Sequence, residues 1–336
     1  MTRHCTPEEL RELVTAALER VNVRADGAAA VARALVAAEC DELASHGLSR
    51  VAFYADQAAS GKVDGQAEPK VEAAGAVVNV DAADGFAYLA IERGLETALA
   101  RVGEQGIVAV GVGNSHHFGV AGHHVERIAE AGCIGIAFGN TPAAMAPWGG
   151  RRPLFGTNPI AFAAPRAGQA PLVMDLSLSR VARGKIMLAQ REGQAIPEGW
   201  ALDADGQPTT DPEAALAGSM VPLGEAKGSA LALMVEILAG ALTGSRFGFE
   251  AGSFFTAEGD PPRVGQLFLV LDPAAFGGAG DFAERLEHLL GAVAAEPGTR
   301  LPGARRLAAR ERIARDGIAV SDAAYADLRR RAGRHD

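Results

Sequence analysis

An apolar run at 107–112 leads directly into a glycine- and histidine-rich stretch, and this junction constrains the fold more than any other part of the chain. Ile107–Val112 has the composition of a buried strand, and Val125, Ile128 and Ala129 begin an apolar helical face. The stretch between them, 111–124, holds four of the eight histidines. A strand that passes into a helix places side chains and free N–H groups beside a cleft, where the helix N-terminus favours anions. We interpret this junction as half of an active site, with Ser45–Arg50 as the other half.

Strand and helix patterns alternate along much of the chain. The sequence predicts strands at 76–81, 107–112, 134–139, 159–163, 172–175 and 266–271. It predicts helices at 7–21, 26–45, 86–105, 122–131, 177–192, 227–243, 281–295, 303–315 and 321–332, the first of them begun by Thr6 as N-cap and Pro7. Segments 61–69 and 197–212 are polar and rich in turn residues, so we expect a linker and a surface loop there. This alternation is typical of a layered α/β fold.

Composition excludes several classes of protein. The 336 residues are 48% hydrophobic and 22% charged, as in an ordinary globular protein with one large core or two domains. The net charge of −9 disfavours nucleic acid and anionic membranes as partners. No apolar run reaches the roughly 20 residues of a bilayer span. The start, Met1–Cys5, lacks a signal-peptide pattern, and three widely spaced cysteines suit a reducing compartment, so we expect a cytoplasmic protein.

Three kinds of site do not fit the histidine-rich stretch. His116 and His123 are seven residues apart, which is about 10.5 Å along a helix and too far for two ligands of one metal ion. Ser45 and Ser115 precede histidines but do not lie in a Gly-x-Ser-x-Gly motif, so we expect no serine nucleophile. Gly111-x-Gly113 is not completed by a third glycine, and the Rossmann fingerprint is therefore absent.

The remaining candidate chemistry is acid–base catalysis on a carboxylate. Histidine is the side chain best suited to transfer a proton near neutral pH, and an arginine fork commonly binds a carboxylate. His46 and Arg50 are four residues apart, so a continuing helical turn would point both side chains the same way. The alternative is a polar helix end at the surface, just as His117 is either an active-site residue or a packed core histidine. Spacing alone leaves both alternatives open.

Three further stretches suit anions or amides. The turn Phe155–Pro159 offers a hydroxyl and an amide, and Lys227 lies in the first turn of a predicted helix, where an anion would relieve its opposition to the helix dipole. Arginines cluster late in the chain, at Arg300, Arg305, Arg306, Arg310, Arg312 and Arg315. That cluster is either a solvated helix face or a phosphate-binding patch.

Six runs of the chain, in order, resemble those of one enzyme family. They are Ser45–Gly47 with Arg50, Asn114–Gly119, Leu154–Pro159, Met174–Ser177 with Gly184–Lys185, Asp211–Pro212, and Lys227–Glu236. On these residues the chain is identified as a member of the malate/L-lactate dehydrogenase family, which is unrelated to the Rossmann-type enzymes. The family includes sulfolactate and ureidoglycolate dehydrogenases, diketogulonate reductase and Δ1-piperideine-2-carboxylate/Δ1-pyrroline-2-carboxylate reductases.

The resemblance implies a mixed-sheet α/β fold of the malate/L-lactate (sulfolactate) dehydrogenase type, which binds NAD(P) without a Gly-x-Gly-x-x-Gly loop. It implies a homodimer and hydride transfer between the nicotinamide and C2 of a small 2-oxo or 2-hydroxy acid. We expect residues 76–259 to form a central mixed-sheet part that binds NAD(P). Residues 1–75 and 260–336 are expected to form a helical part for substrate binding and dimerisation. The expected partner is a small carboxylate.

The resemblance also implies roles for individual residues. His46 is the expected proton donor in reduction, tuned by Ser45, and Arg50 holds the substrate carboxylate. His117 is the second candidate for the acid/base, and the arginines at 300–306 favour NADP over NAD because a 2′-phosphate suits a bidentate partner. Lys185 is a further catalytic candidate, and Asp175, Leu176 and Ser177 are expected to line the substrate. The residues expected to contact the cofactor are His117, Phe118, Gly119, Val120, Ala121, Thr157, Lys227, Arg300, Arg305 and Arg306.

Departures from the family pattern bear on the substrate. The imine reductases place an aspartate where this chain has Lys185, and some have a histidine where it has Ala226. In the family, tyrosines often follow the glycine that precedes these positions, whereas this chain has His123 and His124 there. Lysine at 185 is the pattern of the hydroxyacid dehydrogenases, so we expect a 2-oxo acid of the malate, lactate or sulfolactate type, with a cyclic imino acid as the alternative. A non-catalytic carboxylate- or nucleotide-binding protein, which would bind without turnover, is the alternative from another class.

Overall fold

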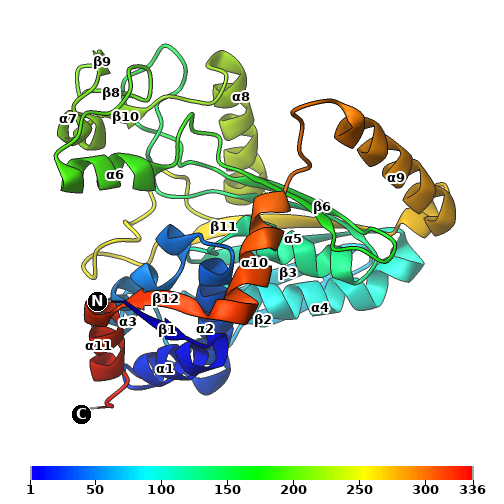
Figure 1. The fold of residues 1–336 in the computed structure, drawn as a ribbon, viewed down its shortest axis with the longest axis horizontal. Helices are drawn as coiled ribbons and strands as arrows, with labels where there is room; N and C mark the ends of the chain where they lie inside the picture. Colours follow the sequence, from blue (N-terminus) through cyan, green and yellow to red (C-terminus); the bar gives the residue numbers. More distant parts are fainter. Residues whose placement is uncertain (1, 335–336) are drawn as a thin grey trace.

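The computed structural model describes residues 2–334 and has a seven-stranded sheet at its centre (Figure 1). The strands are β1 (Thr2–Cys5), β2 (Lys70–Ala74), β3 (Val77–Asp81), β4 (Ile107–Ser115), β5 (Ile134–Gly139), β6 (Ile160–Ala164), β7 (Leu172–Leu176), β8 (Ala201–Leu202), β9 (Pro208–Thr209), β10 (Ser219–Met220), β11 (Val264–Leu271) and β12 (Ile318–Ser321). The helices are α1 (Pro7–Glu19), α2 (Ala25–Cys40), α3 (Val51–Ser60), α4 (Ala87–Gln105), α5 (Ala121–Glu130), α6 (Arg183–Glu192), α7 (Pro212–Ala217), α8 (Ala226–Val235), α9 (Ala279–Ala295), α10 (Ala304–Asp316) and α11 (Asp322–Arg331). Shorter helical turns are η1 (Ala44–His46), η2 (Leu48–Arg50), the π-helical η3 (Glu236–Ala241) and η4 (Pro273–Ala275).

The large sheet is mixed. Its strands follow the order β2-β3-β4-β11-β5-β6-β7. β3 and β4 run parallel, whereas the other neighbouring pairs are antiparallel. β11 enters the middle of the sheet late in the chain and pairs Phe268 with Val110 of β4 on one side and with Ala137 of β5 on the other. This topology confirms the predicted mixed-sheet α/β fold.

Alternation along β11 separates the cores on the two faces of the sheet. Phe268 and Val270 pack in the cluster formed with α4 and α5. Leu267 and Leu269 point the other way, into a cluster that includes Ala239 of η3. Successive side chains of a strand point to opposite faces, so this one strand contributes to both cores.

The two ends of the chain share a third core. β1 and β12 pair antiparallel, with Cys5 opposite Ile318, and α1, α2, α3 and α11 pack around them. Thr6 begins α1 as predicted, because its hydroxyl accepts a hydrogen bond from Glu9 N at 3.1 Å. Sequence patterns predicted α1, α2 and α11 of this core but neither α3 nor its two strands.

A small unit stands above one end of the large sheet (Figure 1). Its strands follow the order β10-β8-β9 and pack with α6 and α7 around Ile186, Ala201 and Ala215. The segment expected to be a surface loop, 197–212, therefore contains two short strands. α6 also begins six residues later than the helix predicted at 177–192. Leu178 N donates to Thr157 O and Arg180 N to Val221 O, both at 2.8 Å, and these bonds hold 178–181 in a non-helical conformation.

The boundaries expected for the two parts of the chain do not match the sheet. β2 and β11 lie outside 76–259, yet both belong to the seven-stranded sheet. The expected central part, with approximate bounds 76–259, therefore leaves out two strands of this sheet. β2 pairs with β3 in a local hairpin just before this range, whereas β11 pairs with β4 and β5 far earlier in the chain, which local sequence patterns do not reveal.

Candidate active site

Two short helical turns, η1 and η2, carry the predicted acid/base and carboxylate-binding residues. They are separate 3-10 turns that meet at Gly47, so no continuous helical turn joins His46 and Arg50. Glu39 of α2 fixes this turn, because its Oε1 accepts a 2.6 Å hydrogen bond from Leu48 N. A Cβ at position 47 would lie 2.1 Å from the same Oε1, so the close approach of Glu39 requires glycine there.

Arg50 is prepared to bind an anion. It is 9% exposed, its Nε donates to Ser45 O at 2.7 Å, and its guanidinium lies over the Phe255 ring at 4.6 Å. Its Nη1 is buried and has no hydrogen-bond partner among residues 2–334. A buried donor without a partner is costly, and a carboxylate would satisfy it.

His46 and His117 lie against each other in this site. Their rings are stacked with centroids 5.5 Å apart, which brings the η1–η2 turn and the β4–α5 junction together. Nδ1 of His46 shares a 3.0 Å hydrogen bond with the Ser45 hydroxyl, which leaves Nε2 as the nitrogen available to exchange a proton. Burial, reinforced by the positive charge of Arg50, lowers the pKa of His46 to about 4. At neutral pH its imidazole is therefore uncharged.

His117 joins a buried chain of hydroxyl groups. Its Nδ1 and the Tyr54 hydroxyl are 2.5 Å apart, and the Tyr54 and Tyr88 hydroxyls are 3.1 Å apart. Burial is the main reason that the pKa of His117 lies well below its usual value, and the pKa values of Tyr54 and Tyr88 are raised for the same reason. All three groups are thus neutral at pH 7. Tyr54 was missed by the sequence analysis, although it lies four residues after Arg50, one helical turn further on.

His116, by contrast, is a structural residue. Gln57 donates through its Nε2 to Phe254 O at 2.9 Å, so its Oε1 accepts from His116 Nε2 at 2.7 Å. The ring is 1% exposed and burial lowers its pKa to about 3. Neighbouring histidines at this junction therefore have different roles.

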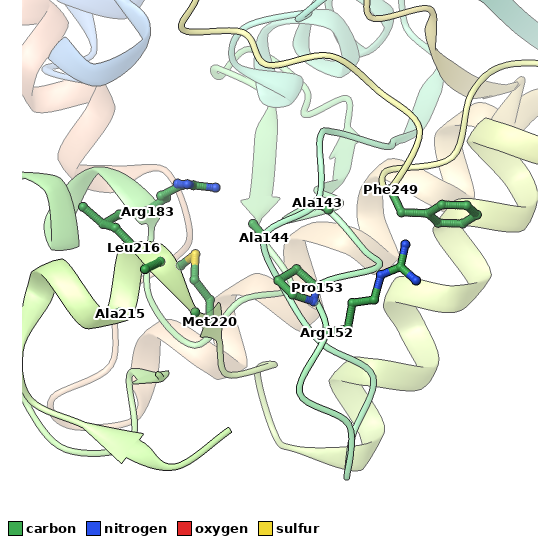
Figure 2. A pocket seen from close by; sticks show the side chains of 11 residues that line it. Ala143, Ala144, Arg152, Pro153, Arg183, Ala215, Leu216, Met220 and Phe249 are labelled. Carbon is green, nitrogen blue, oxygen red and sulfur yellow. The ribbon is translucent and has the colours of Figure 1, made fainter. Parts of the chain in front are cut away.

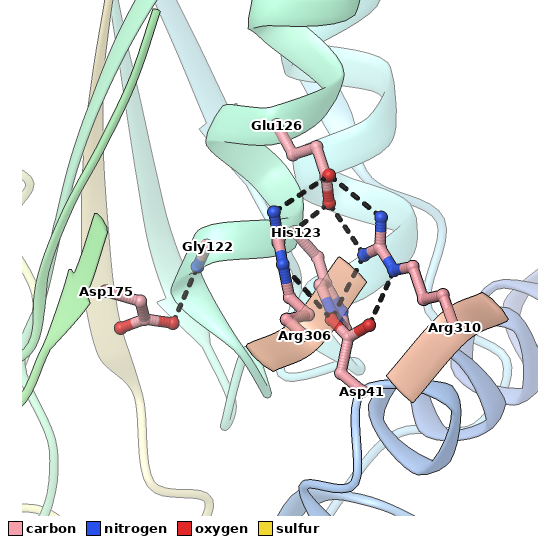
Figure 3. Close-up of polar contacts among 7 residues, drawn as sticks. All are labelled: Asp41, Gly122, His123, Glu126, Asp175, Arg306 and Arg310. Atoms are coloured by element: carbon pink, nitrogen blue, oxygen red, sulfur yellow. Dashed lines mark hydrogen bonds and ion pairs between the residues drawn. The ribbon is translucent and has the colours of Figure 1, made fainter. Parts of the chain in front are cut away.

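The start of α5 is capped from the sheet edge. Gly122 N donates to Asp175 Oδ2 at 2.8 Å, as Figure 3 shows, which joins the helix to β7. Partial withdrawal from water raises the pKa of Asp175 against the opposing effect of this N–H group. Of its neighbours, Leu176 is exposed and Ser177 half-buried, so this edge is open to a ligand.

Behind this cap lies a buried ionic cluster, which we define as Asp41, His123, Glu126, Arg306 and Arg310 (Figure 3). Arg310 forms bidentate pairs with Asp41 and Glu126 at 2.6–3.0 Å, and Arg306 pairs with Glu126 at 3.0 Å. His123 Nε2 lies 2.7 Å from Asp41 Oδ2. Burial alone would raise the pKa of Asp41, but the hydrogen bonds from His123 and Arg310 outweigh it and lower that pKa.

The ionic cluster divides the arginines that were expected to bind the cofactor. Arg306 is engaged inside the protein, whereas Arg300 and Arg305 are exposed and have no ion-pair partner among residues 2–334. Lys227 lies in the first turn of α8, exposed and likewise unpaired within that range. Thr157 N donates to Thr141 Oγ1 at 3.0 Å.

Lys185 lies close to the catalytic turn. The preceding residue, Gly184, faces Ser45, since a Cβ placed there would lie 3.6 Å from the Ser45 Cβ. The structure thus brings together Ser45, His46, His117 and the start of α6. Among the described residues, no hydrogen bond or ion pair links this group to Lys227 or to the exposed arginines.

A buried polar network behind the 141–158 segment was also missed. Glu236, at the start of η3, accepts hydrogen bonds from Asn140, Asn158 and Gly248 N at 2.9–3.1 Å. Asn158 has φ of 40°, a left-handed conformation that asparagine tolerates. The Thr157–Asn158 turn is therefore fixed from below by a carboxylate that no local sequence pattern connects with it.

Residues 2–334 contain neither a metal-binding cluster nor a membrane-spanning helix. No group of three or more histidine, cysteine, aspartate or glutamate residues is arranged to hold a metal ion. No helix of this part of the chain combines the length and apolar character that crossing a membrane requires.

Comparisons with known proteins show the family of the chain. The family described as malate/L-lactate dehydrogenase matches residues 5–329. The chain is 58% identical over 302 residues to a protein of Chromohalobacter salexigens named (2R)-3-sulfolactate dehydrogenase (NADP(+)), with 90% of each chain covered. It is 42% identical over 306 residues to a Δ1-pyrroline-2-carboxylate reductase of Ancylobacter novellus, covering 90% of this chain and 89% of that one.

A solved structure shows the same fold. The Δ1-piperideine-2-carboxylate reductase of Pseudomonas syringae pv. tomato superposes with a TM-score of 0.93 at 38% sequence identity, covering 98% of this chain and 99% of the other. The mixed sheet and its helices are therefore those of a known enzyme fold.

Proposed function

Because this chain belongs to the malate/L-lactate dehydrogenase family, we propose that it transfers a hydride between NADP(H) and C2 of a small 2-oxo or 2-hydroxy acid. The observation that carries this proposal is the unpartnered Nη1 of buried Arg50, four residues from His46. The relative named (2R)-3-sulfolactate dehydrogenase (NADP(+)) supports both the 2-hydroxy acid and NADP.

In this proposal Arg50 binds the carboxylate next to the reacting carbon. His46 gives a proton to the carbonyl oxygen in reduction and takes it back in oxidation, and Ser45 holds its Nδ1. The positive charge of Arg50 lowers the pKa of His46, so a bound carboxylate that offsets this charge raises that pKa. Substrate binding thereby increases the fraction of His46 that is protonated and able to donate in reduction. His117 orients the His46 ring by stacking.

The residues present fit a dinucleotide. Lys227 offers an unpaired cation at a helix start, Thr157 and Ser177 offer hydroxyls, and the edge at Asp175 is open. The start of α5 is less suited to phosphate, since Gly122 N already donates to Asp175. When bound, the cofactor supplies the hydride. We propose that Lys227 binds a phosphate of the cofactor. We propose that the 2′-phosphate is bound by the exposed Arg300 and Arg305 and not by Arg306, which is paired with Glu126.

A second candidate is reduction of a cyclic imino acid, Δ1-piperideine-2-carboxylate or Δ1-pyrroline-2-carboxylate. The 0.93 TM-score to a reductase of that name and the 42% identity to another favour it. Lys185 argues for the open-chain acid, because Gly184 beside it faces Ser45. A cation next in sequence to the residue that faces the catalytic turn suits an acid that bears more negative charge than an iminium substrate does.

The test follows oxidation of NADPH and NADH with pyruvate, oxaloacetate, sulfopyruvate and the two cyclic imines. We expect turnover of the open-chain acids, preferentially with NADPH, and a loss of at least about 100-fold in kcat for His46→Ala, since a positioned acid contributes at least that factor. His288→Ala, which changes an exposed histidine of α9, is the matched control. Turnover of the cyclic imines alone would make the second candidate correct.

We also propose a cytoplasmic homodimer. Along α8 and η3 and at the residue after them, Leu231, Leu233, Ile237 and Leu242 are 41–65% exposed, which is unusual for consecutive turns of an apolar helix. A second copy of the chain would cover exposed apolar side chains of this helix. Light scattering should report twice the chain mass for the wild type and the chain mass for Ile237→Glu. The three free cysteines support a reducing compartment.

A further inference from the structure

The long connection between η3 and β11 has two parts that lie against different regions of the molecule. In the first part, Phe249 lines a cavity of about 420 Å³ beside the start of α6 (Figure 2). The second part, residues 252–262, does not line this cavity. Its two aromatic residues, Phe254 and Phe255, pack on the candidate active site instead. We call this second part the phenylalanine loop.

Three side chains in and just after the last turn of α3 hold the phenylalanine loop. Gln57 Nε2 donates to Phe254 O at 2.9 Å. Ser60 Oγ donates to Ala257 O at 2.8 Å. The ammonium group of Lys62 donates to four further oxygens of the loop, which are Ser253 O at 2.8 Å, Glu258 O at 2.9 Å, Thr256 O at 3.0 Å and Thr256 Oγ1 at 3.3 Å. The backbone thus wraps around one positively charged group.

Lys62 and the phenylalanine loop stabilise each other. Lys62 is 3% exposed, and its hydrogen-bond partners among residues 2–334 are all oxygens of uncharged groups. A Cβ on Gly252 would lie 2.8 Å from Asp260 O and 3.8 Å from Lys62 Nζ, so the loop closes tightly around the ammonium group. A buried cation without partners is costly, and so are buried carbonyl groups without donors. Removal of Lys62 therefore leaves the loop without the donors that fix its shape.

The two phenylalanines connect the loop with the candidate active site. Phe254 is 5% exposed, and its ring centroid lies 5.1 Å from those of both His116 and His117. The Phe255 ring lies under the Arg50 guanidinium at 4.6 Å. Because packed side chains transmit small displacements to their neighbours, a change in the loop moves the groups that these rings contact.

We propose that Lys62 is a positioning residue, whose ammonium group fixes the phenylalanine loop and thereby the rings that pack on His117 and Arg50. The inference rests on the proposed function and deepens it, since it names a group outside the substrate site that sets the geometry of the carboxylate-binding arginine. Backbone carbonyl oxygens also bind free monovalent cations. A small ammonium ion should therefore replace the Lys62 ammonium group once that side chain is shortened.

The test is chemical rescue of Lys62→Ala, measured with whichever acid or imine the wild type reduces. We expect kcat/KM to fall about 10- to 100-fold, as when other groups that orient active-site residues are removed. Methylammonium chloride should recover most of this loss. Tetramethylammonium chloride at the same ionic strength should not, because it has no N–H group to donate. A loss that methylammonium does not relieve, or an unchanged kcat/KM, would overturn the inference.

Two further variants control for general damage. Lys62→Met keeps the buried stem but fills the space of the ammonium group with an apolar methyl group, so its loss of kcat/KM should not be relieved by either salt. If Lys62→Ala does not fold, Lys62→Met still tests the loss. Lys70→Ala, which changes an exposed lysine of β2, is the matched control and should leave kcat/KM and its response to both salts unchanged. Rescue of Lys62→Met by methylammonium would refute a specific site for the cation.

Two measurements without turnover separate failure of this inference from failure of the proposed function. Chymotrypsin should cut after Phe254 or Phe255 faster in both Lys62 variants than in the wild type, because local opening exposes the loop. Methylammonium should slow this cut in Lys62→Ala only. NMR of labelled histidines should show a shifted His117 signal in both variants. Wild-type cleavage rates and signals in the variants would refute the inference for an active enzyme too, whereas altered ones support it even if none of the acids or imines is reduced.

Discussion

His46, His116 and His117 show how much the role of one residue type depends on what surrounds it. His116 is held by Gln57 inside the protein, whereas His46 lies beside a guanidinium with a free donor. His117 shares features of both, because it is stacked on His46 and hydrogen-bonded to buried Tyr54. Sequence spacing marked His46 and His117 as candidates, but only the contacts distinguish His117 from its neighbour.

The Tyr54 hydroxyl should act as a positioning group for His117. Tyr54→Phe removes the partner of His117 Nδ1, so the ring can rotate away from His46. We expect kcat to fall about 10-fold, as for other residues that orient an active-site histidine, and the pH profile of kcat to shift. Tyr88→Phe is the matched control, because Tyr88 bonds to Tyr54 but not to His117. Equal effects of the two variants would contradict the role assigned to Tyr54.

Among the elements, α2 organises the site although it carries no residue proposed to touch substrate. Glu39 near its end binds Leu48 N of the catalytic turn, and Asp41 just beyond it binds Arg310 of α10 and His123 of α5. Three segments distant in sequence thus meet at the end of one helix. The support of the catalytic turn is therefore a tertiary feature.

Asp41→Asn should destabilise the protein more than Glu42→Gln, the matched change at the neighbouring residue, does. Asp41 has a fully buried side chain, and its loss leaves Arg310 and His123 short of a partner. We expect the free energy of unfolding to fall by about 3 kcal/mol, measured by urea denaturation. Glu42→Gln removes an exposed pair with Arg312 and should cost less than about 1 kcal/mol. A loss below 1 kcal/mol for Asp41→Asn would show that Glu126 alone can satisfy Arg310.

The elements that sequence patterns predicted well are those with strong local periodicity. The strand 134–139 and the helix 86–105 agree with β5 and α4 to within one residue, because their apolar patterns are continuous. β1 and β12 were missed because their residues gain strand structure only by pairing with each other across the whole chain. Likewise, the spacing of His46 and Arg50 left open whether a helical turn continues to Arg50, and it is Glu39 and Gly47 that fix two separate turns there.

For the whole molecule, we expect acidic pH to lower the stability of the folded protein. Burial lowers the pKa of His116 to about 3 and that of His124 to about 4, from the ordinary 6.5, and it acts in the same direction on His46 and His117. Between about pH 6.5 and 4 these histidines bind protons in the unfolded chain but stay neutral in the folded one. The free energy of unfolding therefore falls as pH falls. Each histidine contributes a slope of about 1.4 kcal/mol per pH unit in this window.

Urea denaturation at several pH values between 7 and 5 measures this slope. His124→Asn, which replaces the ring bonded to Phe118 O with a group that does not titrate, should reduce the slope by about one histidine's share, about 1.4 kcal/mol per pH unit. His288→Asn, on an exposed face of α9, should leave the slope unchanged. An unaltered slope in His124→Asn would show that this ring accepts a proton without unfolding.

The bond between Asp41 and Arg310 also has a consequence for how the protein is made. The two residues are 269 positions apart, and a ribosome that adds about 5–20 residues per second needs roughly 10–50 s to cover that distance. β11, which fills the middle of the sheet, emerges almost as late. An unfinished chain therefore lacks both the sheet and the support of its catalytic turn. The cell obtains an active molecule only when translation is nearly complete, and a prematurely terminated product cannot compete for substrate.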